Sequence, residues 1–481
     1  MSADTIFALA SAAGRSGVAV FRISGPHAGD ALQALTGKDL PEPRVAVKRR
    51  LYAASPEEQA LPPLGGRVGW GAASDDIDHR ETPLPTSHLK AGGEKSIPLD
   101  DALVLYFKGP ASFTGEDVVE LHVHGGPAII AALTKALGAL GLRLAEPGEF
   151  TRRAFDHGKL DLVEIEGLAD LIAAETEAQR RQALRQAEGE LSALYEKWRG
   201  ALISALARME AAIDFPDEDL PDDLIANVDA TMGALAKEIG AHLADNHRGE
   251  LLRDGFSVAI IGAPNVGKSS LLNRLAKRDA AIVSAQAGTT RDIIEVKLDL
   301  GGFPVLVADT AGLRQSPDEI EQEGVRRALK RAEFADLKLI VFDGATWPDF
   351  DADVAAQIDE TAIVVLNKAE LADGRKTAIG ERELLLVSAK TGQGLDALVA
   401  MLTEQAGQAL NPGSQPALTR LRHRSALERC LGALERGRAA RVVELKAEDL
   451  RIAVQALGRI TGRVEVDDVL DLIFREFCIG K

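Results

Sequence analysis

Near the middle of the chain, four residues have the types and the spacing of a phosphate-binding loop. The pattern G-x-x-x-x-G-K-S/T is matched by Gly262, Gly267, Lys268 and Ser269. An apolar run at 256–261 precedes them, and an amphipathic run with leucines follows. An ordinary strand, turn and helix could carry the same pattern by chance. The flanking runs favour a strand–loop–helix unit that binds the phosphates of a nucleotide.

Each residue type of this loop has its own chemistry. The glycines allow backbone amides to turn toward phosphate oxygens where a side chain would collide. Lys268 supplies a positive charge to those phosphates, and the Ser269 hydroxyl is placed to ligate Mg²⁺. A helix that begins near Ser269 adds the positive end of its dipole. We therefore expect a nucleotide with bound Mg²⁺ at this loop.

Four further motifs follow in the order that a Ras-like GTPase requires. They are AGTTRD at 287–292, DTAG at 309–312, NKAE at 367–370 and SAK at 388–390. Thr290 is a second candidate ligand of Mg²⁺, Asp309 supports the ion through water, and Gly312 offers its amide to the γ-phosphate. The predicted nucleotide-binding residues are Asn265, Val266, Gly267, Lys268, Ser269, Ser270, Ala287, Gly288, Thr289, Thr290, Asp309, Thr310, Ala311, Gly312, Asn367, Lys368, Glu370, Ser388, Ala389 and Lys390.

The carboxylate of Glu370 predicts the base. A carboxylate accepts hydrogen bonds from both N1–H and the exocyclic amino group of guanine, whereas adenine presents no such pair of donors. GTPases normally carry Asp at this position, and the extra methylene of Glu370 keeps both acceptors while it moves them by about one bond. We therefore expect GTP rather than ATP.

The residue that follows the DTAG motif is unsuited to hydrolysis. Leu313 stands where Ras-type enzymes have the glutamine that orients the attacking water, and an apolar side chain cannot do this. Arg291 and Arg314 are nearby, but neither is marked by the sequence as an arginine finger. Another group must therefore neutralise the charge of the transition state and hold the water.

The composition bounds what the rest of the chain can be. With 481 residues, 46% apolar and 27% charged, about three globular domains are expected. No apolar run approaches the ~20 residues of a membrane span, and no signal pattern begins the chain, so the cytoplasm is expected and a membrane is not. Two cysteines, Cys430 and Cys478, exclude a disulfide framework and a cysteine-built zinc site.

The net charge of −17 argues against non-specific coating of nucleic acid, which needs a broad basic face. Local basic clusters could still dock a specific RNA. For each cluster a solvated helix face is the interpretation that we favour. The clusters are Arg152–Arg153, Arg180–Arg181–Arg185 and Arg420–Arg422–Arg424.

Residue patterns place these motifs in a multidomain α/β chain. Residues 1–157 predict an α+β domain with strands at 17–23 and 118–123 and a helix after Pro127. Residues 49–98 lack a pattern, and 65–98 are expected to form a long loop. Helical spacing covers 158–250 and 415–481, on either side of an α/β G unit at 255–405. Because the ends of such a unit usually lie close together, we expect the flanking helices to form one all-α domain into which the G unit is inserted.

The chain resembles the family of tRNA-modification GTPases called MnmE or TrmE, and the resemblance covers essentially its whole length. It rests on RISG at 22–25, GPASFTGEDVVELHVHGGP at 109–127, PGEFTRRAFDHGKLDL at 147–162, AAIDFPDE, GAPNVGKSSLLN, AGTTRD, DTAGLR and the terminal FCIGK. These motifs are far more specific than a GTPase signature. The resemblance implies an N-terminal folate-binding and dimerisation domain, a helical domain, and a Ras-like P-loop G domain.

For hydrolysis, the resemblance implies activation by K⁺. Its ligands would be Asn265, Ser284, Gln286 and Thr289, and Ser284, Ala285 and Gln286 would join the nucleotide-binding set. K⁺ at the phosphates would supply the charge that an arginine finger gives elsewhere. Glu321, otherwise a solvated residue in an acidic helix start, would orient the water. The G domains of the family dimerise in GTP and K⁺, so hydrolysis would depend on a homodimer.

For the N-terminal domain, the resemblance implies that Arg22, Glu120, Lys159 and Lys481 contact a tetrahydrofolate derivative, either 5,10-methylene or 5-formyl. A pterin offers an amidine-like edge to Glu120, and a glutamyl tail suits Arg or Lys; each residue could equally be a surface charge or a strand-end salt bridge. Cys478 would be a reactive cysteine near the folate, although a buried inert thiol is the alternative. The terminal CIGK is a poor fit to prenylation signals.

The resemblance implies that the chain modifies C5 of wobble uridines in certain tRNAs, by carboxymethylaminomethyl or aminomethyl addition. It would act in a heterotetramer with the flavoprotein MnmG, which brings FAD and NADH. Two alternatives stay open. One is a ribosome- or RNA-assembly GTPase switch without modification chemistry, and the other is a folate enzyme that acts alone, which leaves the GTPase unexplained.

Overall fold

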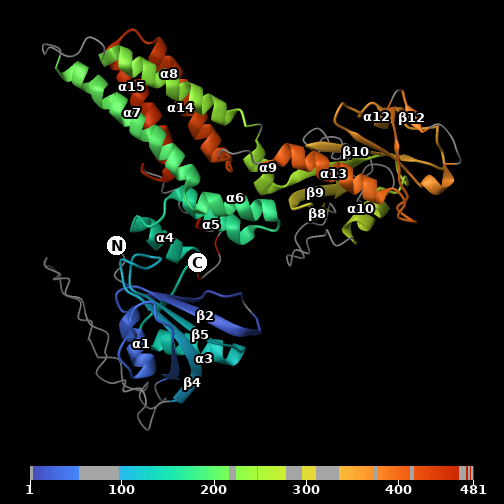
Figure 1. Cartoon of the computed structure of the whole chain (residues 1–481). Helices are drawn as coiled ribbons and strands as arrows, with labels where there is room; N and C mark the ends of the chain where they lie inside the picture. The colour runs from blue at the N-terminus through green and yellow to red at the C-terminus, as the bar shows by residue number, and fades with distance from the viewer. Residues whose placement is uncertain are drawn as a thin grey trace, which may run out of the picture. The chain divides into compact units, whose positions relative to one another are not determined.

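The computed structural model describes residues 4–12, 14–53, 97–215, 224–245, 247–277, 295–309, 335–372, 377–380, 382–411, 416–464, 473–474, 477 and 480 (Figure 1). The chain divides into two compact units. The first comprises residues 1–165 and 465–481, and the second comprises 166–464. No helix among the described ranges is long and apolar enough to cross a membrane.

The first unit is built on a six-stranded sheet of order β3-β4-β5-β2-β1-β6. Apolar side chains of the sheet and of its helices form the core, and Leu32, Val104, Leu121 and Leu133 are fully buried there. The elements are β1 (Ile6–Leu9), β2 (Ser16–Ser24), α1 (Ala28–Thr36), β3 (Val47–Ala53), β4 (Ile97–Phe107), β5 (Val118–Gly125), α3 (Pro127–Ala139), β6 (Arg143–Leu144) and α4 (Glu149–Asp156). The predicted strands at 17–23 and 118–123 and the helix after Pro127 are confirmed.

Strand β3 corrects one expectation. Residues 49–98 were expected to lack regular structure, but 49–53 belong to β3 and Ile97–Pro98 begin β4, with which β3 pairs. The sequence VKRRLYA hides the strand because β3 is at the edge of the sheet, where charged side chains reach solvent. Residues 54–96, which hold most of the expected loop, lie outside the described residues.

The α/β part of the second unit has a sheet of order β14-β11-β10-β7-β9-β8, in which β8 alone runs antiparallel to its neighbour among the described strands. Carboxyl ends of parallel strands meet at one edge, so the loops that follow them are brought together. The elements are β7 (Phe256–Ile261), α10 (Lys268–Ala276), β8 (Glu295–Leu300), β9 (Phe303–Asp309), β10 (Leu337–Asp343), α12 (Ala352–Ala355), β11 (Ile363–Asn367), η2 (Ala369–Leu371), β14 (Leu385–Leu386) and α13 (Leu395–Leu410), with β12 (Ala378–Ile379) and β13 (Arg382–Glu383) as a separate ribbon.

Helices from both sides of this α/β part pack together, as predicted (Figure 1). Arg451 of α15 pairs with Glu210 of α7 at 3.1 Å, and Lys446 pairs with Asp229 of α8. The α/β part is therefore inserted in a helical domain. The helices are α5 (Leu162–Ala173), α6 (Glu177–Ala187), α7 (Glu190–Asp214), α8 (Leu224–Leu243), α9 (Arg248–Asp254), α14 (Leu421–Ala439) and α15 (Val443–Thr461). The sequence predicted one helix up to about residue 247 and missed α9.

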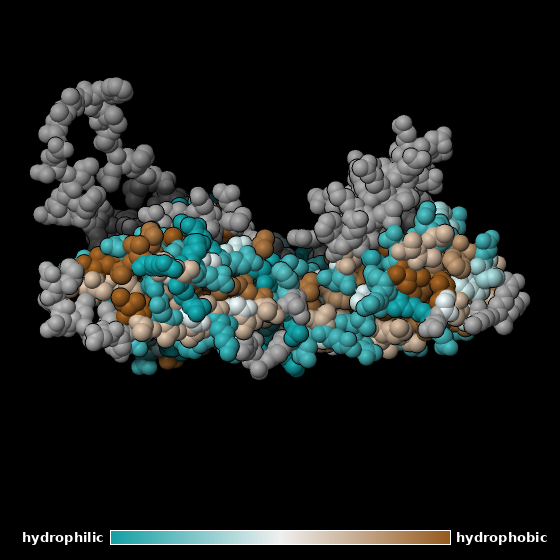
Figure 2. All heavy atoms as spheres, turned by 90° about the horizontal axis from the view of Figure 1, so that it is seen from above, coloured by the Kyte–Doolittle hydropathy of each residue, from teal (hydrophilic) through white to brown (hydrophobic). Residues whose placement is uncertain are grey.

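Figure 2 shows apolar surface at the end of the helical bundle where α8 and α15 begin. Phe215, Ile225, Val442 and Leu445 are 41–59% exposed there.

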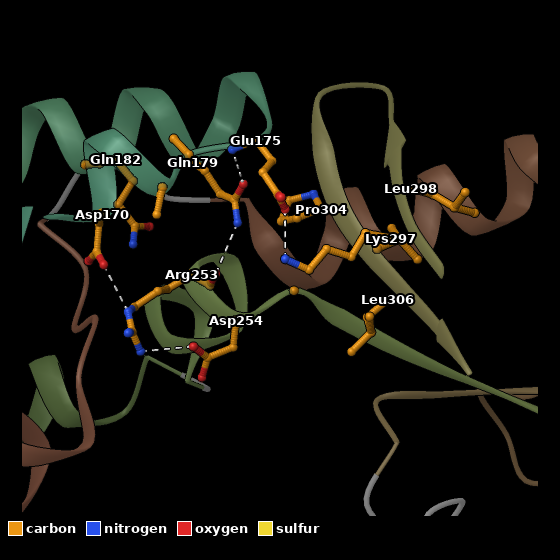
Figure 3. Close-up of a pocket in the computed structure, with 15 residues that line it drawn as sticks. Asp170, Glu175, Gln179, Gln182, Arg253, Asp254, Lys297, Leu298, Pro304 and Leu306 are labelled. Carbon is orange, nitrogen blue, oxygen red and sulfur yellow. Dashed lines mark hydrogen bonds and ion pairs between the residues drawn. The ribbon is translucent and has the colours of Figure 1, made fainter. Parts of the chain in front are cut away.

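At the other end of the helical bundle, α6 contacts the α/β part (Figure 3). Lys297 of β8 lies 2.9 Å from the Glu175 carboxylate, and the backbone N–H of Ala178 donates to the Gly302 carbonyl at 3.0 Å. The β8–β9 hairpin, which connects the AGTTRD and DTAG segments, is thus tied to the helical domain.

The expectation of a solvated helix face is wrong for the basic cluster at 420–424. Arg422 donates to both oxygens of Glu166 at 2.6 and 2.7 Å, and the Glu166 side chain is 2% exposed. Arg420 pairs with Asp170, and Arg424 with Asp245 and Glu250. These arginines therefore hold the two halves of the helical domain together. Arg180 and Arg181 do lie on an exposed face, paired with Glu177 of their own helix.

A candidate nucleotide-binding site

The phosphate loop follows β7 at the carboxyl edge of the sheet. Asn265 and Gly267 have φ angles of 63° and 96°, a left-handed conformation that turns successive backbone amides toward one side. A Cβ on Gly267 would overlap Nδ2 of Asn367, and a Cβ on Gly262 would lie 2.5 Å from the Val341 carbonyl oxygen. Both glycines of the motif are therefore required by close contacts with the neighbouring strands.

Lys268 begins α10 and is buried within the loop. Its ammonium donates to the carbonyl oxygens of Gly262 at 2.7 Å and of Ala263 at 2.9 Å. The charge is thus held at the centre of the loop, where a phosphate would meet it. Ser269 and Ser270 are exposed in the first turn of the helix, and the hard hydroxyl oxygen of Ser269 is of the type that Mg²⁺ binds.

Asn367 at the end of β11 connects the motifs. Its side chain is buried, and its Nδ2 donates to the Val266 carbonyl of the phosphate loop at 2.8 Å. Its Oδ1 accepts from the backbone N–H of Ala389 at 3.1 Å. One side chain therefore joins the phosphate loop to the NKAE and SAK segments, and the structure brings together three of the motifs that the sequence predicted.

Glu370 lies on η2 with an exposed side chain. A hydrogen bond from the Ser388 side chain lowers the pKa of this carboxyl, as does a hydrogen bond to backbone. Both of its oxygens are therefore acceptors at neutral pH, as guanine recognition requires. Ser388 is fully buried, and its Oγ accepts from the backbone N–H of Thr391 at 3.0 Å, so the SAK turn is fixed beside Glu370.

The sequence reasoning missed Asp343 at the end of β10. Its Oδ2 accepts from the Lys368 ammonium at 2.6 Å, and the same ammonium donates to the Asn265 carbonyl at 3.1 Å. A single aspartate after an apolar run has no characteristic spacing. The sequence could have indicated Asp343 only as the last residue of an apolar strand, because that strand, β10, lies between β7 and β11 in the sheet.

Several predicted residues lie outside the described part of the chain, namely 284–290, 310–312, Glu321, Cys478 and Lys481. The backbone of Asp309 ends β9 opposite Ile260 of β7, which puts it at the same edge as the phosphate loop. Within the described ranges, no three His, Cys, Asp or Glu side chains gather as a metal cluster would require.

Of the predicted folate contacts, the structure brings two together. Arg22 of β2 and Glu120 of β5 are opposite each other, and the Arg22 guanidinium donates to one Glu120 oxygen at 2.9 and 3.1 Å. The guanidinium also lies over the rings of Phe113 and Phe150, at 5.5 and 5.8 Å from their centroids. Lys159 donates to the Pro110 carbonyl at 2.9 Å, in the loop that carries Phe113.

Known proteins with the same sequence features were found by comparison. The family model described as the MnmE helical domain matches residues 162–478, and that of the GTP-binding protein TrmE N-terminus matches 72–159. The tRNA modification GTPase MnmE of Paramagnetospirillum magneticum is 54% identical over 99% of this chain and 100% of its own length. The protein of that name from Rhodospirillum rubrum is 55% identical, with all of both chains covered.

A solved structure of the GTPase Era from Aquifex aeolicus, bound to GDP·AlF4⁻, is 27% identical. The match covers 37% of this chain and 66% of that chain with a TM-score of 0.24, which is too low to compare the folds of the whole proteins.

Proposed function

This chain belongs to the family of tRNA modification GTPases named MnmE, and we propose that within this role it is a K⁺-activated GTPase that acts on C5 of wobble uridines. It hydrolyses GTP and acts in tRNA modification. The observation that carries the catalytic part of the proposal is the set of bonds around Asn367, which assembles a phosphate loop and a base-reading carboxylate at one edge of the sheet.

The residues of this chain divide the work of hydrolysis. Lys268 offsets negative charge on the phosphates, Ser269 and Thr290 hold Mg²⁺, and Glu370 accepts from the guanine edge. Leu313 cannot orient water, and we assign that task to Glu321. The missing positive charge is assigned to K⁺ at Asn265, Ser284, Gln286 and Thr289, whose oxygen donors suit a hard cation. The exposed side chain of Asn265 and its left-handed backbone support this assignment.

We assign the folate site to Arg22, Glu120, Lys159 and Lys481. The contact of the Arg22 guanidinium with two aromatic rings supports it, because a flat pterin can stack on the same kind of surface. When bound, the tetrahydrofolate derivative would supply a one-carbon unit, and Cys478 is proposed as the nearby reactive thiol. A homodimer, joined to the flavoprotein MnmG with its FAD and NADH, would complete the system.

Nucleoside mass analysis tests the proposal. Cells that lack this chain should have wobble uridines without the carboxymethylaminomethyl or aminomethyl group, and the wild-type gene should restore it. A Cys478→Ser chain should hydrolyse GTP normally but fail to restore the modification. A Glu321→Ala chain should bind GTP with wild-type affinity and lose most turnover. Normal nucleosides together with defective ribosomal subunits would instead support an assembly GTPase without modification chemistry.

A further inference from the structure

Lys368 is the only described residue of the NKAE segment with a left-handed backbone, at φ 58° and ψ 42°. A lysine has no intrinsic preference for this conformation, so neighbouring contacts must hold it. Its ammonium donates to the Asp343 carboxylate at 2.6 Å and to the Asn265 carbonyl at 3.1 Å. The first is an ion pair between side chains that are 33% and 14% exposed, which is partly shielded from water.

Asp343 is itself held rigidly. Its second oxygen, Oδ1, accepts from the backbone N–H of Ala345 at 2.9 Å. The next residue, Gly344, donates its N–H to the Asn367 carbonyl at 2.7 Å, and a Cβ on it would lie 2.7 Å from the Lys368 carbonyl oxygen. The end of β10 is therefore held closely against the NKAE segment, and the Asp343 carboxylate is fixed by its bond to the Ala345 N–H.

The chain of contacts ends at the phosphate loop. Asn265, like Lys368, has a left-handed backbone, and the carbonyl that accepts from Lys368 is its own. The exposed Asn265 side chain belongs to the same residue as that carbonyl. A charge at Asp343 thus acts through Lys368 on the residue to which the proposed function assigns K⁺.

We infer that Asp343 is a positioning residue that fixes Lys368 against Asn265 and thereby couples guanine-nucleotide binding to K⁺ activation. The coupling to K⁺ rests on the proposed function, whereas the effect on nucleotide binding does not. Loss of the Asp343 charge leaves the ammonium with one neutral acceptor, which loosens both the base-side segment and the phosphate loop.

The test compares Asp343→Asn with a matched variant at the other end of the same strand. Asp336, just before β10, accepts from the backbone N–H and from Oγ of Ser257 at 2.8 Å each. It lies beside the start of β7, whereas the phosphate loop follows the end of that strand. Asp336→Asn therefore removes an equally well-bonded carboxylate from the same sheet. Thermal unfolding of both variants monitors any general weakening, and Asp343→Ser, whose hydroxyl can still accept from Ala345, is a second variant should Asp343→Asn fail to fold.

For Asp343→Asn we expect about a tenfold higher Kd for GDP and GTP, the lower end of what a hydrogen bond to a charged group contributes. The K⁺ concentration for half-maximal hydrolysis should rise with it, and Asp336→Asn should change neither. An unchanged Kd, or equal changes in both variants, would overturn the positioning role. A higher Kd with unchanged K⁺ half-saturation would overturn the coupling to Asn265. Absence of K⁺ stimulation in the wild type would instead refute the proposed function and the coupling, while the Kd still decides the positioning role.

Discussion

The side-chain amide of Asn367 donates to the Val266 carbonyl at 2.8 Å, across 101 residues of sequence. Because the same side chain accepts from Ala389, it is the point at which base recognition and phosphate binding become one structure. Three segments that are separate in the sequence, namely the phosphate loop, NKAE and SAK, are therefore joined directly by hydrogen bonds of one side chain.

Replacing Asn367 by Ala should weaken nucleotide binding strongly. The substitution leaves the buried Val266 carbonyl and the partly buried Ala389 N–H without their partner, at up to about 1–3 kcal/mol for each unsatisfied group. We expect the Kd for a fluorescent GDP analogue to rise at least about tenfold, with a lower unfolding temperature of the α/β part. Asn273→Ala on the exposed face of α10 is the control and should match the wild type. Equal Kd values for Asn367→Ala and the wild type would contradict the role given to this side chain.

Glu370→Asp tests how the base is read. Because the shorter carboxylate restores the residue that GTPases normally carry, GDP should bind with equal or higher affinity. Isothermal titration with GDP, ADP and xanthosine diphosphate measures this selectivity. If xanthosine or adenosine nucleotides compete equally with GTP, in the wild type or in Glu370→Asp, residue 370 does not select guanine.

Arg422→Ala should destabilise the helical domain. It leaves the Glu166 carboxylate, which is almost wholly buried, without its two guanidinium bonds. Breaking such a pair typically costs about 3–5 kcal/mol, and we expect the lower end because Arg422 is 24% exposed. Calorimetric unfolding of the full chain is the measurement, with Arg429→Ala on an exposed face of the same helix as the control. If the two variants unfold at the same temperature, the buried pair does not hold the domain together.

His423 gives the helical domain a pH dependence. Burial, together with the nearby Arg422 charge, lowers the pKa of this imidazole from 6.5 to about 4. The imidazole therefore takes up a proton at higher pH in the unfolded chain than in the folded chain. As far as His423 is concerned, the folded helical domain has its full stability above pH 6.5 and loses stability as the pH falls toward 4. The full shift corresponds to about 3 kcal/mol.

Unfolding temperatures of the full chain between pH 7 and pH 4.5 check this dependence. His423→Gln keeps a donor toward Glu166 but removes the titration, so its unfolding temperature should fall less over this range. A His423→Gln slope equal to that of the wild type would contradict the assignment.

Much of the nucleotide site could be predicted from the sequence because its parts are local. The apolar runs before GAPNVGKS and NKAE predict strands that are followed by functional loops. The structure has β7 and β11 at these two runs. The partner of Lys368 could not be predicted, since Asp343 reaches it only through the parallel pairing of β10 with β11. The buried roles of Arg420, Arg422 and Arg424 were hidden for the same reason: their carboxylate partners are 174–256 residues away.

We propose that a bound K⁺, held in part by Asn265, supplies the positive charge that an arginine finger gives in other GTPases. The most direct measurement is the GTP hydrolysis rate of the full chain in KCl and in NaCl at equal ionic strength, for the wild type and for Asn265→Gly. Glycine tolerates the left-handed backbone at this position, so the variant removes only the side-chain amide. We expect a much higher wild-type rate in KCl, and a loss of that stimulation in Asn265→Gly with GDP affinity retained. Equal wild-type rates in the two salts, or full K⁺ stimulation of the variant, would contradict the claim.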